Sequence, residues 1–188
     1  TFDCHIPEGN ACWYFSTPQG DHDVTCVEQT WWHQFAKDSG LELILNESYS
    51  GSTICNSGYD GADYSDRAFT TRMFKVAEGK PDLIIVFGGT NDSWANSPVG
   101  ELQFDRWSSK DMYSCLPSCC FMLNYLTMAA PESEIIFIIN SELKDEITAG
   151  IAEACDHYGV HWLLLKDIEK KWGHPSIKGM AQINEQLK

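Results

Sequence analysis

Three short polar clusters in the sequence contain residue types that could together catalyse acyl transfer. They are Ser50-Gly51-Ser52, Gly89-Thr90-Asn91-Asp92 and Gly173-His174-Pro175. A backbone N–H, such as that of Gly51, and an amide side chain, such as that of Asn91, can stabilise the negative charge that develops on an attacked carbonyl oxygen. A histidine such as His174 titrates near neutrality, so it can take up and return a proton. The clusters therefore supply an oxyanion hole and a base, and they lack an obvious nucleophile.

The second cluster follows a stretch that is typical of a strand buried on both faces of a parallel sheet. Residues 82–87 read DLIIVF, and Gly88 and Gly89 then allow the chain to turn sharply. Asn91 and Asp92 come just beyond the carboxyl end of this strand, where open α/β sheets bind their ligands. Such residues also form ordinary turns and helix caps. We expect Gly89 to aim Asn91 at the site, and Asp92 to form structural hydrogen bonds.

The whole chain alternates between strand-like and helix-like segments. Apolar runs predict strands, at residues 41–45, 82–87, 134–139 and 160–165. Amphipathic or capped stretches predict helices, at residues 27–39, 63–77, 110–130, from 142 to about 158, and 174–188. After a predicted loop at residues 1–26, this alternation indicates a single α/β domain over residues 1–188, with a parallel sheet and helices on both faces. Because parallel strands end at one edge of a sheet, the loops that carry the three clusters can converge.

Composition and charge argue against several classes of protein. A chain of 188 residues with a formal net charge of −14 repels phosphate groups and anionic lipids, which disfavours nucleic-acid and membrane-surface binding. No apolar run reaches the roughly 18 residues that span a bilayer. The eight cysteines are scattered without paired zinc-binding elements, so free thiols are predicted and no metal or organic cofactor is implied. Free thiols favour a cytoplasmic location, and the absence of an initial Met leaves a secreted or periplasmic location open.

In their order along the chain, the three clusters resemble the sequence blocks of the SGNH/GDSL hydrolase family. Gly51 lies in NESYSGST like the glycine of the second block, residues 89–92 match the G-x-N-D block, and His174 begins HPSIKGM as in the fifth block. The order and spacing agree from about Trp31 to the C-terminus. The resemblance implies a flavodoxin-like three-layer α/β/α sandwich. It also implies that the Gly51 N–H and the Asn91 amide form the oxyanion hole and that His174 is the general base.

The resemblance further implies a nucleophile that the printed residues do not contain. In the family, a G-D-S-x-S block ends the first strand and carries the nucleophilic serine. One subgroup runs from that block directly into a segment similar to residues 1–9 of this chain. We therefore expect the nucleophile and the first strand upstream of Thr1. The serines at positions 50, 52 and 93 are expected to form loop hydrogen bonds instead.

The acid partner of His174 is open. The family has an aspartate three residues before the histidine, and this chain has Lys171 there, which cannot accept a hydrogen bond from an imidazole. Asp167 and Glu169 are the nearby carboxylates, and a backbone carbonyl in their place would leave a Ser–His dyad. Asp167 is the preferred candidate.

Two functions follow from these residues. The first is a serine esterase that hydrolyses small acyl esters, among them O-acetyl groups on carbohydrate. Trp94, Trp107 and Trp172 would then either form a sugar-binding wall or close the edge of the core. The second function is a non-catalytic carbohydrate-binding or structural domain with the same fold. Nucleotide binding, as in flavodoxin, would need a phosphate-binding loop after the first strand.

Overall fold

The computed structural model describes residues 22–188, which divide into two compact units. One unit is Gly51–Leu164, and the other joins the described residues up to Ser50 to Leu165–Lys188. Most of the predicted N-terminal loop lies outside the described residues, as do two of the eight cysteines. The six cysteines that are described are free, as predicted. None of the described helices is both long and apolar enough to cross a membrane.

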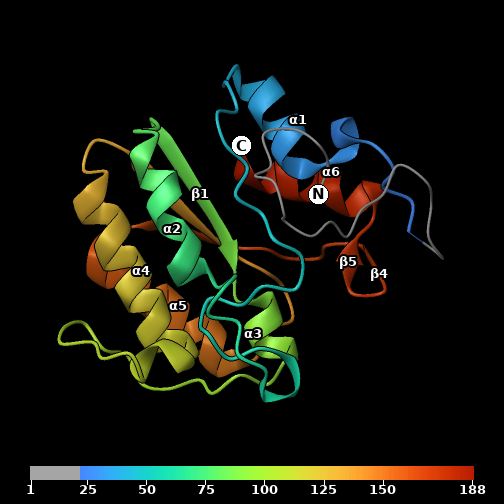
Figure 1. The fold of residues 1–188 in the computed structure, drawn as a ribbon. Helices are drawn as coiled ribbons and strands as arrows, with labels where there is room; N and C mark the ends of the chain where they lie inside the picture. Colours follow the sequence, from blue (N-terminus) through green and yellow to red (C-terminus); the bar gives the residue numbers. More distant parts are fainter. Residues whose placement is uncertain (1–21) are drawn as a thin grey trace. The chain divides into compact units, whose positions relative to one another are not determined.

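The unit Gly51–Leu164 is built on a three-stranded parallel sheet. Its strands are β1 (Leu83–Gly88), β2 (Glu134–Ile139) and β3 (His161–Leu164), in the order β1-β2-β3 (Figure 1). Leu83 pairs with Glu134 and Ile136 with His161, which sets the register of both ladders. The predicted strands agree with these bounds to within one residue. β1 and β2 are apolar runs that are largely buried in the sheet, whereas β3 is an edge strand that is partly exposed.

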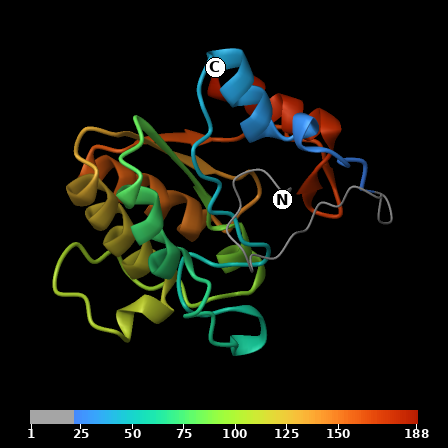
Figure 2. The ribbon, with the colours of Figure 1, turned by 45° about the horizontal axis from the view of Figure 1, so that its top comes forward.

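Three helices of this unit form a layer along one face of the sheet. They are α2 (Phe69–Glu78), α4 (Cys115–Ala129) and α5 (Asp145–Tyr158), with α4 between the other two (Figures 1 and 2). The core between the helices and the sheet contains Phe137, Leu123 and Ile151, all fully buried. Pro117 is accommodated in the first turn of α4, where a proline N–H is not needed. The α/β fold with a parallel sheet flanked by helices is thereby confirmed.

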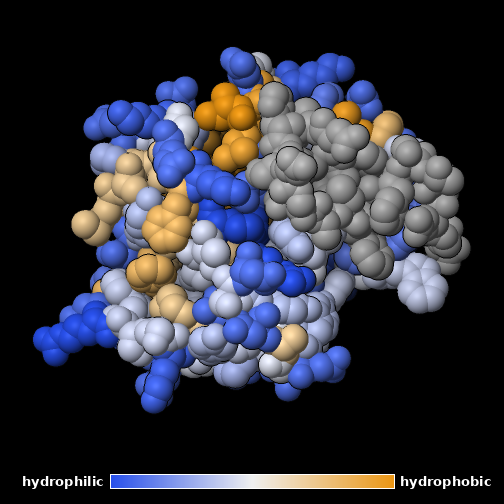
Figure 3. Space-filling view, in the orientation of Figure 1, coloured by the Kyte–Doolittle hydropathy of each residue, from blue (hydrophilic) through white to orange (hydrophobic). Residues whose placement is uncertain are grey.

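The outer surface of this helical layer is not uniformly polar. Phe74 on α2 and Met128 on α4 are exposed, and Phe74 makes an edge-to-face contact with Tyr125 at 4.7 Å between ring centroids. Figure 3 shows hydrophobic atoms over α2 and α4 within a largely hydrophilic face.

The second unit contains helices α1 (Trp31–Ser39) and α6 (Ile177–Leu187), which pack together, and a small antiparallel hairpin. The hairpin joins β4 (Lys170–Lys171) to β5 (His174–Pro175). Asp38 ties the two helices, because its carboxylate accepts a hydrogen bond from Asn184 Nδ2 at 3.0 Å.

Two sequence predictions for this unit are wrong. Residues 41–45 belong to no described strand, and Leu41 and Ile44 are 43% and 49% exposed. An apolar run becomes a strand only where a neighbour bonds its backbone groups. The last helix does not begin at His174 either. The backbone of His174 is paired with Lys171 in the hairpin, and the Ser176 side chain caps α6 by accepting from the Gly179 N–H at 3.1 Å.

Candidate active site

The turn at the end of β1 is shaped by Gly89. This residue has φ of +90° and caps the short helix α3 (Thr90–Trp94). A Cβ at this position would lie 3.0 Å from Ile151 Cδ1, so both the backbone conformation and the close approach of α5 require glycine. The turn directs the chain from the buried strand straight into α3, which places Asn91 in the first turn of this helix.

The side-chain amide of Asn91 is oriented by two hydrogen bonds. Asn91 Nδ2 donates to the backbone carbonyl of Ser52 at 2.9 Å, and the Tyr59 hydroxyl donates to Asn91 Oδ1 at 2.8 Å. A carbonyl can only accept, so the atom that faces Ser52 must be the amide nitrogen. This contact uses one of the two Nδ2 hydrogens. The second has no partner among residues 22–188, so it is available to an oxyanion.

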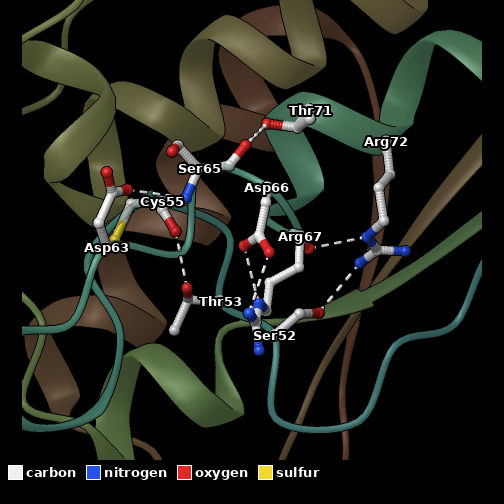
Figure 4. A network of polar contacts seen from close by, with 9 residues as sticks. All are labelled: Ser52, Thr53, Cys55, Asp63, Ser65, Asp66, Arg67, Thr71 and Arg72. Atoms are coloured by element: carbon white, nitrogen blue, oxygen red, sulfur yellow. Dashed lines mark hydrogen bonds and ion pairs between the residues drawn. The ribbon is translucent and has the colours of Figure 1, made fainter. Parts of the chain in front are cut away.

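Gly51, the other predicted donor, lies one residue from the carbonyl that Asn91 contacts. It has φ of +77° in a turn, and its N–H bonds to no group within the described part of the chain. The next residue, Ser52, is buried, and its Oγ accepts from the Arg72 guanidinium at 3.0 Å (Figure 4). Thus the structure brings together the two predicted oxyanion-hole residues.

Asp92 fastens the loop after Gly51 to helix α3. Its carboxylate is fully buried and accepts from the backbone N–H of Ile54 at 2.9 Å and from that of Cys55 at 3.2 Å. Burial raises the pKa of Asp92, although the backbone N–H groups of Ile54 and Cys55 oppose this shift. Ile54 and Cys55 precede Asp92 by 38 and 37 residues in the sequence, so these hydrogen bonds join two distant segments of the chain.

Replacing Asp92 by alanine is expected to destabilise the protein by about 3 kcal/mol, because two buried backbone donors would lose their acceptor. The free energy of unfolding, measured with urea, is the test. Asp105→Ala is the matched control, because Asp105 is exposed and pairs only loosely with Arg106, at 3.8 Å. The control is expected to change stability by less than about 0.5 kcal/mol. Equal effects of the two substitutions would contradict this role of Asp92.

Arg72 is the buried cation of this region. It reaches from α2 to Ser52 and donates from Nε to the Arg67 carbonyl at 2.8 Å (Figure 4). Its guanidinium also lies over the Phe69 ring. Arg67 is turned the other way and pairs with Asp66 at 2.8 Å. A buried guanidinium held this way keeps the Ser52 side chain in one position, and Ser52 carries the carbonyl that Asn91 contacts.

His174, the predicted base, lies in the other unit on β5. Its imidazole is partly buried, and its ring centroid is 5.6 Å from that of His22 in an edge-to-face arrangement. Burial lowers the pKa of His174 to about 4, and the neighbouring His22 contributes to this shift. The imidazole is therefore neutral at neutral pH, which is the form that accepts a proton.

The carboxylates considered as acid partners do not contact His174. Asp167 is exposed and has no hydrogen bond or ion pair within the described residues. Glu169 instead accepts from Ser176 Oγ at 2.7 Å and pairs with Lys178 at 3.2 Å. Lys171, at the position where the family has aspartate, pairs with Asp23 at 3.1 Å. The structure therefore does not join Asp167 to the base.

The other serines and tryptophans divide into buried and exposed groups. Ser93 Oγ accepts a hydrogen bond from the backbone N–H of Lys144 at 3.1 Å. Like that of Ser52, its hydroxyl is therefore used in a structural hydrogen bond. Trp107 packs against Phe121 and donates to the Gln103 carbonyl at 2.8 Å, so it closes the core. Trp172, at the hairpin turn, is 76% exposed, and Trp94 is also exposed.

Tyr59 and Arg72 are the site residues that sequence patterns did not indicate. Tyr59 begins a single 3₁₀ turn (Tyr59–Gly61) 32 residues before Asn91, and a turn this short has no periodicity that would reveal the contact. Asn140 directly follows β2, and its Nδ2 donates to Thr90 Oγ1 at 3.0 Å, so the ends of β1 and β2 share a polar contact. Within residues 22–188, no group of histidine, cysteine and acidic side chains could hold a metal ion.

A parallel α/β sheet with a glycine and an asparagine donor beside the end of β1 is the arrangement of the SGNH class of proteins. The family described as GDSL-like Lipase/Acylhydrolase matches residues 1–188, and the chain belongs to this family. No curated protein matches the chain.

Two solved structures from Bacteroides are similar over nearly the whole chain. A candidate GDSL-like lipase from Bacteroides ovatus is 48% identical, with a TM-score of 0.93 over 96% of this chain and 86% of its own. One from Bacteroides uniformis is also 48% identical, with a TM-score of 0.95 over 100% of this chain and 88% of its own. The fold is therefore that of these proteins.

More distant structures share the fold. An acetyl xylan esterase from Butyrivibrio proteoclasticus is 18% identical, with a TM-score of 0.58 over 86% of this chain and 54% of its own. A carbohydrate esterase whose active site displays catalytic and non-catalytic binding functions is 15% identical, with a TM-score of 0.63 over 85% of this chain and 55% of its own.

Proposed function

We propose that this protein is a serine ester hydrolase that acts on small acyl esters. The observation that carries the proposal is the orientation of the Asn91 amide, which is held by Ser52 and Tyr59. Within residues 22–188, one Nδ2 hydrogen of Asn91 has no partner, and neither has the backbone N–H of Gly51, the residue before Ser52. Two such donors can stabilise the oxyanion of a tetrahedral intermediate.

The proposed reaction has two stages. In the first, neutral His174 takes the proton of a serine hydroxyl while the serine oxygen attacks the ester carbonyl carbon. The carbonyl oxygen becomes an oxyanion, which accepts hydrogen bonds from Gly51 and Asn91, and His174 then protonates the departing alcohol. In the second stage, water attacks the acyl-serine with the same base and the same oxyanion donors. The acid is released and the serine is regenerated.

The proposal does not assign Asp167 or Glu169 as the acid partner of His174. Asp167 makes no side-chain hydrogen bond within the described residues, and Glu169 accepts a hydrogen bond from Ser176 instead. The nucleophile is a serine of the family's first block, which residues 1–188 do not contain. We therefore assign neither Ser52 nor Ser93 to this role, because their hydroxyls already bond to Arg72 and to the Lys144 backbone.

Carbohydrate O-acetyl groups are the proposed natural substrates. This specificity is supported by the exposed Trp172, two residues before His174, since an indole face can stack on a sugar ring. The names of the distant structures, which include an acetyl xylan esterase, point the same way.

The test is hydrolysis of 4-nitrophenyl acetate and of acetylated xylan by the intact protein, together with labelling by a fluorophosphonate. We expect turnover of both esters, faster hydrolysis of acetyl than of octanoyl esters, and one labelled serine that peptide mapping identifies. Absence of both turnover and labelling would overturn the proposal in favour of a non-catalytic carbohydrate-binding protein. Binding of xylan without hydrolysis would also favour that non-catalytic function.

A further inference from the structure

The contact between Tyr59 and Asn91 carries an inference that rests on the proposed function and goes beyond it. An asparagine amide has two chemically different ends, and only the nitrogen end can donate to an oxyanion. If the amide group of Asn91 rotated by half a turn, its Oδ1 would face the oxyanion, and the two negative oxygens would repel each other. The orientation of this amide therefore decides whether the hole works.

Two groups on Asn91 oppose that rotation, and they act at opposite ends of the amide. The Ser52 carbonyl accepts from Nδ2 at 2.9 Å, and the Tyr59 hydroxyl donates to Oδ1 at 2.8 Å. If the amide turned over, Oδ1 would face the Ser52 carbonyl, and two acceptors would meet. A hydroxyl that donates to Oδ1 also draws electron density away from the amide nitrogen, which strengthens the remaining N–H as a donor.

The segment that carries Tyr59 is held in place by contacts of its own. The Gly58 N–H donates to the Ala62 carbonyl at 2.8 Å, and the Ala62 N–H donates to the Tyr59 carbonyl at 3.0 Å. Ser97 Oγ donates to the Ser57 carbonyl at 2.7 Å, which ties the segment to the chain just after α3. Tyr59 is thus presented to Asn91 by a segment that is tethered by its own hydrogen bonds.

We propose that Tyr59 is a positioning residue for the oxyanion hole, which fixes the Asn91 amide with its free N–H toward the substrate and polarises it. Tyr59 does not itself touch the reacting atoms. Its effect is expected in the transition state, where the oxyanion carries full charge, and not in the binding of the neutral ester.

The test is Tyr59→Phe, which removes only the hydroxyl. We expect kcat to fall by roughly three- to tenfold with KM within about twofold, because one hydrogen bond of ordinary strength is lost in the transition state. Tyr64→Phe is the matched control. Tyr64 lies in the same loop, and its hydroxyl has no hydrogen-bond partner among the described residues, so its loss is expected to leave both constants unchanged.

A double-mutant cycle separates positioning from a general structural role. In an Asn91→Ala background, Tyr59→Phe is expected to have no further effect on kcat, because Tyr59 acts only through Asn91. If the fold-loss in kcat of the double variant equals the product of the two single losses, the inference is overturned. It is also overturned if Tyr59→Phe alone has the kcat of the wild type. An inactive wild-type protein would overturn the proposed function itself, whereas an active wild type with an unchanged Tyr59→Phe variant would overturn this inference only.

Discussion

Replacing His174 by alanine is expected to lower kcat/KM for ester hydrolysis by about 10²- to 10⁴-fold, because a positioned general base contributes about that much. His33→Ala is the control, since His33 lies in the same unit on α1 and contacts Trp32. Added imidazole is expected to restore part of the activity of His174→Ala. Equal activity of the two variants would contradict the role of His174 as the base.

The pH profile of the wild type provides a second measurement of the same role. A base must be neutral to accept a proton, so activity is expected above the pKa of His174 and is lost as the pH falls through it. Burial and the neighbouring His22 place this pKa at about 4, well below the ordinary 6.5. Activity should therefore persist through pH 6, where an unperturbed histidine would already be largely protonated. A midpoint of loss near pH 6.5 would contradict this assignment.

Replacing Asn91 by alanine is expected to lower kcat by about 10²- to 10³-fold with little change in KM, which is the cost of removing one oxyanion donor. Asn91→Asp should be at least as damaging, because a carboxylate cannot donate and repels the oxyanion. Steady-state kinetics on 4-nitrophenyl acetate measure both. Asn124→Ala on α4 is the control, since the Asn124 side chain has no hydrogen bond in the described part of the chain. A rise in KM at constant kcat would instead assign Asn91 to substrate binding.

The parts of the fold that could be predicted from sequence are those with a repeating physical pattern. The strands β1 and β2 are apolar runs such as EIIFII, whose burial follows from their composition alone. Residues 41–45 have the same composition, and yet no described strand pairs with them, because pairing depends on a neighbour and not on the run itself. The hairpin of His174 pairs only two residues on each side, too few to show any period.

The site was predictable only in part for a related reason. Gly51 and Asn91 could be proposed as oxyanion donors by resemblance, since each lies in a recognisable block. The residues that hold them could not: Tyr59 contacts Asn91 from 32 positions away, and Arg72 contacts Ser52 from 20 positions away. Such supporting contacts arise from tertiary packing and leave no local signal. The opposite also occurs: Asp167 and Glu169 lie close to His174 in the sequence, and yet neither side chain contacts its imidazole.

The division of the chain into two units has a consequence for how the catalytic functions could change. Both proposed oxyanion donors and the contacts around them, including those of Asp92 and Tyr59, belong to Gly51–Leu164, whereas His174, the proposed base, and its short hairpin belong to the other unit. In the proposed enzyme, charge stabilisation and proton transfer are thus assigned to separate stretches of the chain. The hydrogen bonds that hold the Asn91 amide come from Ser52 and Tyr59, so a mutation in the hairpin is expected to change the working pH without removing either of them. Selection could therefore adjust the working pH and the strength of the oxyanion hole as independent traits.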